Sequence, residues 1–202
     1  MANRAYLFPT DHDEQWTPDC SGEGVYYDSR HTIPIAWWFL FEPADLRLIE
    51  REEADPVRPR QPMRLAFIRL RCNRAQAIAR FVNRRPLVHL AVKGRIEACD
   101  VDFFEAILRN WSGQYLVMDP DEILEATVDN DFARLKRVLE ALSPPKPDMD
   151  AFLSLLGESS TMPAESDALD KRVVKVLGYT YGELANRLTR EMGEGNRKQE
   201  IE

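Results

Sequence analysis

The sequence predicts an α+β fold: a small mixed or antiparallel sheet of short strands, packed with amphipathic helices and followed by a helical C-terminal extension. The 202 residues include 44% apolar side chains, enough for one domain with a buried core. A few short strand patterns alternate along the chain with helical patterns, which is typical of α+β proteins. The proline-rich segment 143–147 then interrupts the chain before further helical sequence.

In the first quarter of the chain, prolines and glycines mark the expected boundaries. An apolar, aromatic start favours a strand, and the polar stretch after it, with two glycines and Pro18, favours a loop. Prolines at 34 and 43 suit the first turns of helices. The expected elements are a strand at 5–8 closed by Pro9, a loop at 10–31 with a local hairpin at 25–27, a helix from about Thr32, and a second helical stretch from Pro43 to about Glu53.

The middle of the chain alternates between the two periodicities. Residues 63–71 place apolar side chains on both faces of a strand, and Asn73 follows as a candidate helix N-cap. Apolar residues spaced by three and four mark the later helices. The expected elements are strands at 63–71, 87–92 and 114–118, and helices at 73–82, at 103–111 with Asp100 or Asp102 as cap, and at 132–142.

Three regions are expected from the position of the proline-rich segment. Residues 1–142 form the α+β domain, residues 143–192 form a proline linker with a helical extension, and residues 193–202 form a disordered tail. Within the extension we expect helices at about 151–156 and 169–177. Thr180 and Glu183 match a capping box, which predicts the start of a last helix.

Charge is distributed unevenly along the chain. Residues 1–55 carry 4 basic and 12 acidic side chains, a net of −8, and residues 97–202 carry 12 basic and 22 acidic, a net of −10. Residues 56–96 carry 11 basic side chains and no acid, which completes the total of −7. We call residues 56–96 the basic block.

The arginines of the basic block are the first candidates for binding a partner. Arginine recognises phosphates and carboxylates with two parallel hydrogen bonds, and Phe67 or Phe81 offers a stacking surface. Internal neutralisation by acids such as Glu50 and Asp55 is the favoured interpretation, ahead of an acidic protein partner and then of nucleic acid. The net negative charge of the chain opposes nucleic acid. The candidate partner-binding arginines are Arg64, Arg69, Arg71, Arg74, Arg80 and Arg84.

The aromatic run 37–41 is the second candidate. Adjacent residues on a helix point about 100° apart, so one helix face cannot bury all of these side chains. A surrounded, buried helix is favoured. The alternative places Trp37 and Phe41 in a protein interface, because exposed tryptophan clusters mark partner sites.

No motif predicts a catalytic, metal or cofactor site. The histidines and acids around His12, Cys20 and His31 match no zinc spacing, and no nucleophile elbow or phosphate-binding loop occurs. Cys72, with His89 farther along the chain, is the single pair that merits inspection as nucleophile and base. Three widely spaced cysteines and no long apolar run favour a cytoplasmic protein without a membrane span.

Three segments resemble a family of uncharacterised bacterial proteins. They are the opening Met1–Leu7 (Met-Ala-Asn-Arg-x-Tyr-Leu-like), the Ile-Pro-Ile segment with its apolar helix at Ile33–Phe41, and the strand and acidic helix start at Tyr115–Ile123. The resemblance covers about residues 1–142. It implies a bacterial source and carries no activity and no site residues.

Together these observations favour a non-catalytic interaction protein of a bacterial cytosol, of the immunity or antitoxin kind that binds and masks a protein partner. One alternative is an enzyme of unrecognised type, with a site on the loop 10–31 and Cys72 or His89. Another is a nucleic-acid binder that uses residues 58–95.

Overall fold

The computed structural model has the predicted α+β fold. It describes residues 4–12, 26–30, 33–54, 62–92, 96–120, 124, 128–143, 145–159 and 179–181. Six strands form one sheet in the order β3-β4-β5-β1-β2-β6, and each of these pairings is antiparallel. The strands are β1 (Arg4–Thr10), β2 (Tyr26–Arg30), β3 (Leu46–Ala54), β4 (Pro62–Asn73), β5 (Tyr115–Asp119) and β6 (Tyr179–Tyr181).

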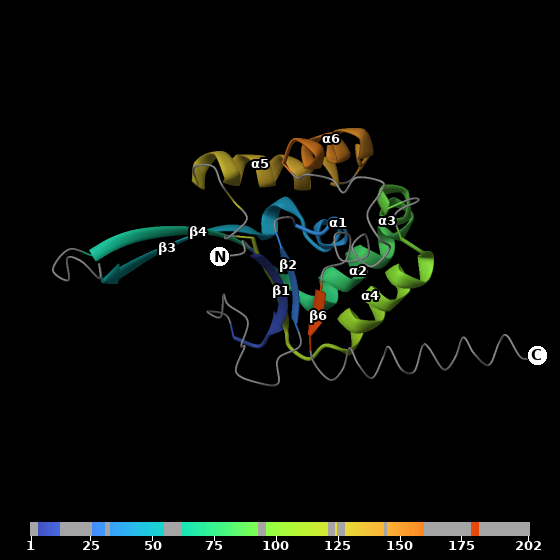
Figure 1. Ribbon diagram of the computed structural model, residues 1–202, viewed down its shortest axis with the longest axis horizontal. Helices are drawn as coiled ribbons and strands as arrows, with labels where there is room; N and C mark the ends of the chain where they lie inside the picture. The colour runs from blue at the N-terminus through green and yellow to red at the C-terminus, as the bar shows by residue number, and fades with distance from the viewer. Residues whose placement is uncertain are drawn as a thin grey trace, which may run out of the picture.

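Helices cover one side of the sheet. Helices α1 to α4 pack beside the central strands, and α5 and α6 run above them (Figure 1). None of the described helices is both long and apolar enough to span a bilayer. The bounds are α1 (Ile35–Trp38), the 3-10 turn η1 (Pro43–Asp45), α2 (Arg74–Asn83), α3 (Arg85–Val92), α4 (Ala98–Asn110), α5 (Val128–Ala141) and α6 (Met149–Ser159).

The two faces of the sheet differ in what they contact. Alternate strand residues such as Leu7, Leu70 and Met118 belong to the hydrophobic core that the helices share. Their neighbours Phe8 and Val117 are also buried, yet they lie outside that core, on the other face. We call these the helix face and the opposite face.

The aromatic run is buried because its helix is short. α1 is a single turn that ends at Trp38, and the chain then continues as turn and coil through Phe41. Without a continuous helix, the fixed angle between adjacent side chains does not apply, and every residue from Ile35 to Phe41 is buried. Tyr27 and Trp37 have ring centroids 6.5 Å apart.

The expected helix from Pro43 to Glu53 is wrong. One 3-10 turn forms, and the nine-residue strand β3 then begins at Leu46. β3 pairs with β4 along its whole length, from Leu46 opposite Leu70 to Ala54 opposite Pro62. Pairing with a distant segment overrides the helical spacing of Leu46 and Ile49, which was the basis for the helix.

Two expected strand features are also wrong. The run 87–92 lies in helix α3 and not in a strand, and its Leu90 points to solvent. Tyr26 and Tyr27 form no local hairpin, because β2 pairs with β1 and β6. A short apolar run does not distinguish a buried helix from a strand.

The remaining expected elements near the sheet are confirmed with small shifts. Asn73 caps α2, and its side-chain oxygen accepts from the amides of Ala75 and Gln76 at 3.0 and 3.3 Å. α4 starts earlier than expected: its N-cap is Glu97, and Asp100 supplies the return bond of the capping box. The strands expected at 5–8, 63–71 and 114–118 correspond to β1, β4 and β5, and the helices expected at 132–142 and 151–156 to α5 and α6.

Segments after the proline-rich stretch contact the same core. Phe152 and Leu156 of α6 belong to it, and Phe152 meets Phe39 with ring centroids 5.4 Å apart. Thr180 lies in strand β6 and not at a helix start, so the capping-box prediction is wrong. The helix expected at 169–177 and the tail 193–202 lie outside the described residues.

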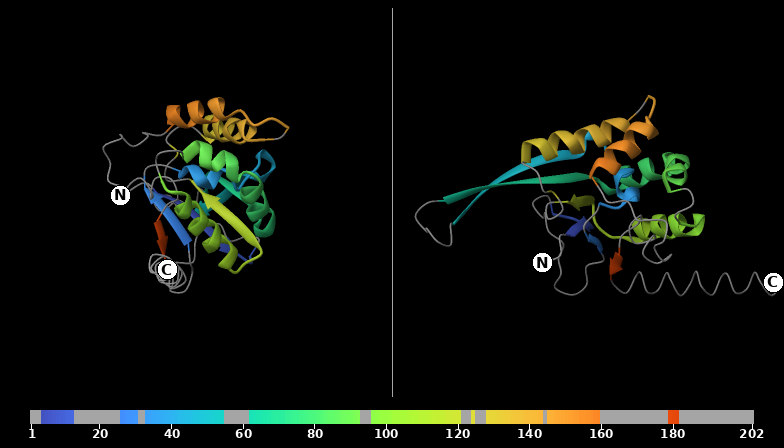
Figure 2. Two further views of the ribbon diagram at one scale, coloured as in Figure 1. Left: turned by 90° about the vertical axis from the view of Figure 1, so that its right-hand side faces the viewer. Right: turned by 45° about the horizontal axis from the view of Figure 1, so that its top comes forward.

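The outer part of β3 and β4 extends beyond the rest of the molecule. β4 pairs with β5 only from Leu70 to Asn73, so its residues 62–69 pair with β3 alone. Figures 1 and 2 show this pair as a long arm on one side of the molecule. We call residues 48–54 and 62–68 the ribbon. Neither strand is short, in contrast to the prediction.

Candidate functional site

The helical half of the basic block is held inside the protein by a network of ion pairs. Arg80 on α2 contacts Asp45 at 2.5 Å and Glu42 at 3.2 Å. Arg84, just after α2, contacts Glu42 at 3.3 Å and donates to the backbone carbonyl of Phe41 at 2.9 Å. These bonds fasten the segment between α1 and β3 onto α2.

Burial shapes the electrostatics of this network. Desolvation raises the pKa of the Asp45 carboxyl above its ordinary value, although the Glu42 amide and Arg80 act in the opposite direction. Desolvation lowers the pKa of the Arg84 guanidinium, and the charge of Glu42 opposes that shift. The network therefore satisfies charges that folding removes from water, which is a structural role.

Two more arginines of this half hold α4. Arg74 donates to the carbonyls of Gly113 at 2.7 Å and Leu108 at 3.2 Å, so it caps the C-terminal end of α4. Arg85 pairs with Asp102 and with Glu105 on the same helix. The acids that neutralise the basic block thus come from both sides of it in the sequence.

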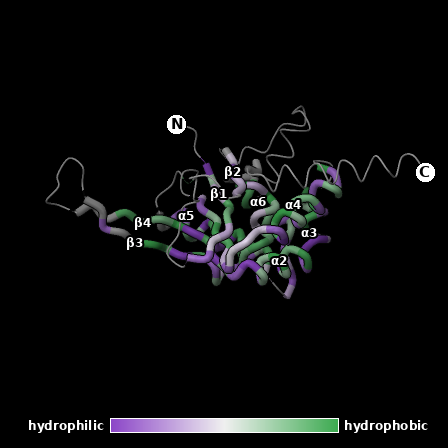
Figure 3. Tube along the Cα trace, turned by 90° about the horizontal axis from the view of Figure 1, so that it is seen from below, coloured by the Kyte–Doolittle hydropathy of each residue, from purple (hydrophilic) through white to green (hydrophobic). Residues whose placement is uncertain are grey.

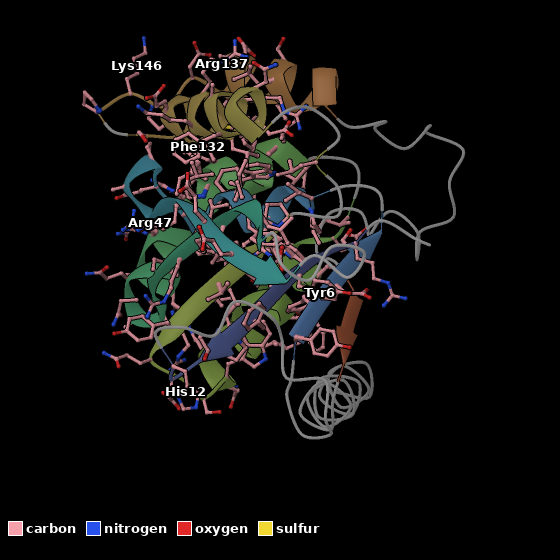
Figure 4. The ribbon with its side chains drawn as sticks, turned by 90° about the vertical axis from the view of Figure 1, so that its left-hand side faces the viewer. Tyr6, His12, Arg47, Phe132, Arg137 and Lys146 are labelled. Carbon is pink, nitrogen blue, oxygen red and sulfur yellow. The ribbon has the colours of Figure 1, made fainter. Side chains whose placement is uncertain are left out.

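Arg69 and Arg71 lie on the opposite face of the sheet. Arg69 pairs with Asp119 at 2.9 Å, and both side chains are more than nine-tenths buried. The guanidinium of Arg71 stands 3.8 Å from the centre of the Tyr115 ring, a cation–π contact. Figure 4 looks onto this face of the molecule.

The strand register sets a polar row across the opposite face. Tyr6 lies opposite Asp28 on one side and Asp119 on the other. The next positions in the row are Arg69 and then Arg47, which are opposite each other in β4 and β3. Tyr6 and Arg47 are labelled in Figure 4. Asp28 is fully buried and pairs with Arg4 at 3.1 Å.

The candidate arginines therefore do not form one exposed basic face. Arg69, Arg74, Arg80 and Arg84 make the internal contacts given above, as the favoured interpretation expects. Arg71 contacts Tyr115, and Arg64 lies opposite Glu52 in the ribbon, with its side chain outside the described parts. The other two candidates, Trp37 and Phe41, are both 0% exposed, which corrects their assignment to a partner-facing surface.

The inspected pair of Cys72 and His89 has no catalytic geometry. Burial raises the pKa of the Cys72 thiol far above its ordinary value, so the thiolate that would act as nucleophile is disfavoured. The thiol faces the Leu40 carbonyl at 4.0 Å, whereas His89 on α3 contacts Arg85 at 3.4 Å. These environments support a packing role for Cys72.

The sequence predicts no metal site around His12, Cys20 and His31. Among the described residues, no three potential ligands cluster. His12 is exposed at the end of β1, where Figure 4 labels it, and Asp11 accepts a hydrogen bond from the Gln114 amide at 2.8 Å. Cys20 and His31 lie outside the described ranges.

A shallow cavity of about 450 Å³ lies beside α2 and α4. It is lined by small or apolar side chains and by two polar residues at its edge, and it contains no group that pairs a nucleophile with a base. The lining residues are Ala75, Ile78, Ala79, Val82, Asn83 and Arg109. Arg109 is already paired with Glu105 at 2.8 Å.

The ribbon is the surface that the sequence interpretation missed. Its Leu48 is 43% exposed, one of the two large apolar side chains exposed in the described parts. Glu50 is exposed, and Ile49 and Phe67 are half-buried. Figure 3 shows hydrophobic and hydrophilic stretches along this arm. The sequence contains a signal for it: two segments with apolar residues, 46–49 and 63–70, flank a stretch with prolines at 56, 59 and 62.

Comparison of the chain with family models, with curated proteins and with solved structures gives no match. The fold and the surface described above are therefore the basis for a functional proposal.

Proposed function

We propose that this protein is a non-catalytic protein-binding module, and that the ribbon is the element that contacts the partner. The observation that carries the proposal is the projection of β3 and β4 from the body, where β4 residues 62–69 pair with β3 alone. A two-stranded hairpin by itself is only marginally stable in water. Packing of the core does not account for an arm of this length, and contact with another molecule would stabilise it.

The chemistry of the ribbon supports a protein as the partner. It combines exposed Leu48 and half-buried Ile49 and Phe67 with charged residues, as the mixed surfaces of non-obligate protein complexes do. The net charge of −7 favours a basic partner. Binding and masking a basic protein is the action of an immunity or antitoxin protein, and this is the specific form of the proposal.

The internal use of arginines counts against the nucleic-acid alternative. Arg69, Arg74, Arg80 and Arg84 already bind carboxylates or carbonyls, and phosphates would have to displace them. The enzyme alternative receives no support from Cys72, whose thiol is buried.

A shortened variant tests the proposal directly. Residues 49–67 are replaced by Asn-Gly, which joins Leu48 to its cross-strand partner Ile68 through a two-residue turn. Wild-type and shortened proteins are immobilised and incubated with lysate of the source organism, and captured proteins are identified by mass spectrometry. We expect one stoichiometric basic partner on the wild type and none on the shortened variant.

The captured partner is then purified and titrated against both proteins by calorimetry. Circular dichroism and a cooperative urea transition serve to verify that the shortened variant is folded. Equal affinity for both proteins would show that the ribbon is not the docking element. A wild-type protein that captures no partner would overturn the binding proposal itself.

A further inference from the structure

We infer that the partner docks by adding a basic strand to the outer edge of β3. This inference rests on the proposed protein-binding function and states how the partner is recognised. It identifies the partner by its chemistry: an extended segment with lysine or arginine at alternate positions, followed by an apolar residue on the same face.

The outer edge of β3 has the geometry for strand addition. β3 stands first in the sheet order, and among the described strands only β4 pairs with it. Every strand carries backbone donors and acceptors on both edges at alternate residues, so an edge strand offers one set to an incoming chain. The nine residues of β3 are long enough for an extended peptide.

The side chains on β3 define what the added strand must carry. Leu48, Glu50 and Glu52 alternate on one face of the ribbon, and all three are exposed. A neighbouring strand about 4.8 Å away places one side chain opposite each of them. An apolar residue therefore suits Leu48, and two basic residues suit the glutamates.

The opposite charges of the neighbouring strands β3 and β4 also favour a basic added strand. The outer half of β3, residues 50–53, contains three glutamates and one arginine, a net of −2, whereas β4 is free of acid. A basic strand beyond β3 makes the order basic, acidic, basic, with opposite charges on neighbouring strands. The same glutamates repel acidic strands, which makes the edge selective.

Pairing with a second copy of this chain over the acidic part of β3 sets like charges opposite each other. Twofold antiparallel pairing of β3 with itself, centred on Ile49, sets Arg47 opposite Arg51 of the copy. Pairing centred on Glu50 sets that glutamate opposite itself. Like charges directly opposite each other destabilise a strand pair, so both registers are disfavoured.

Synthetic peptides test the inference with the full-length protein. The probe is a fluorescein-labelled peptide, Thr-Lys-Thr-Lys-Thr-Val-Thr, and the control replaces its lysines by glutamates. Binding is measured by fluorescence anisotropy at low salt. We expect the lysine peptide to bind at least about tenfold more tightly than the control, because exposed ion pairs are weak singly and two act together here.

Backbone methylation separates strand addition from simple charge attraction. Two further lysine peptides are N-methylated at odd or at even positions. Successive amides of a strand point to opposite edges, so one methylated peptide should lose binding and the other should retain it. Equal binding by both peptides, or equal loss, would contradict strand addition.

Protein variants locate the site. Glu50→Lys should weaken the lysine peptide about tenfold. Glu140→Lys, the same charge change at an exposed position of α5, should alter binding less than about twofold.

Three results would overturn the inference. They are equal effects of the two variants, tighter binding of the glutamate peptide, and a wild-type dimer in sedimentation that Glu50→Lys disrupts. If no peptide binds while the shortened variant still loses its lysate partner, the inference fails and the proposed function stands.

Discussion

The two halves of the basic block lie in contrasting environments. In the helical half, Arg80 and Arg84 are held by Glu42, Asp45 and backbone carbonyls inside the protein. In the strand half, β4 leaves the body and becomes one strand of the exposed ribbon. A segment without a single acid therefore does not form a basic surface, because its counter-charges come from elsewhere in the sequence. The helical half stabilises the fold and the strand half contributes to the proposed docking surface, and variants of single residues can test the two roles separately.

The largest effect is expected at Arg84. Arg84→Ala removes one of the two arginine partners of Glu42 and the donors to the Phe39 and Phe41 carbonyls, all near the core. The free energy of unfolding should fall by about 3 kcal/mol, as measured by urea denaturation. The matched control is Arg47→Ala, whose side chain is exposed, and a change below about 0.5 kcal/mol is expected there. Similar losses in both variants would show that the internal contacts of Arg84 stabilise the fold no more than an exposed arginine does.

A smaller effect is expected where the two halves meet. Asn73 ends β4 and caps α2 through bonds to two amides. Asn73→Ala should lower the free energy of unfolding by about 1 kcal/mol, whereas Asn83→Ala at the other end of α2 should have a smaller effect. Urea denaturation of both variants measures the difference, and a larger loss for Asn83→Ala would contradict the capping role.

The pH dependence of stability sharpens the description of the helical half. Because burial raises the folded-state pKa of Asp45, the folded protein binds a proton there more strongly than the unfolded chain does. The resulting stabilisation is complete below the unfolded pKa and is lost as pH rises through the folded pKa. Wild type should therefore gain stability relative to Asp45→Asn as pH falls from neutrality toward the ordinary value of 3.8.

Urea denaturation of wild type and Asp45→Asn at several pH values measures this change. A carbon-13 NMR titration of the Asp45 carboxyl provides the independent check, with a midpoint above the ordinary value. A midpoint at or below that value would show that Arg80 outweighs the burial of the carboxyl.

The smallest effect on stability is expected in the ribbon. Glu50→Lys with Glu52→Lys should change the free energy of unfolding by less than about 0.5 kcal/mol, because both side chains are exposed. The same variant should lose its protein partner in the capture experiment. A strong loss of stability would instead assign the ribbon to the structural half of the comparison.

Local signals in the sequence were sufficient for elements whose stabilising contacts are close in the chain. The sequence predicts Asn73 as a cap, and its side-chain oxygen accepts hydrogen bonds from amides only two and three residues away. The α+β class also followed from local patterns. The spacing of Leu46 and Ile49 indicates a helix, whereas the contacts that make β3 a strand come from β4, farther along the chain. The capping-box pattern at Thr180 predicts a helix start, but Thr180 lies in β6, which pairs with the distant strand β2 opposite Tyr27.

The candidate site was harder to predict than the fold. The arginines were visible in the sequence, but their use depends on acids such as Glu42 and Asp119, whose proximity only the folded chain reveals. Burial of Trp37 and Phe41 followed from a helix that ends after one turn, which no local spacing indicated. The sequence does not predict the ribbon, because the spacing of Leu46 and Ile49 favours a helix where β3 lies.

The connectivity of the sheet has a consequence for synthesis on the ribosome. β3 and β4 are consecutive in sequence, so the ribbon can pair soon after Asn73 has left the exit tunnel. The rest of the sheet forms later, because β1 pairs with β5, which is synthesised much later. The nearby hydrogen bond from the Gln114 amide to Asp11 joins residues 103 positions apart. Both strands of the ribbon have therefore emerged before the sheet is complete, and a partner present at the ribosome would meet the proposed docking element first.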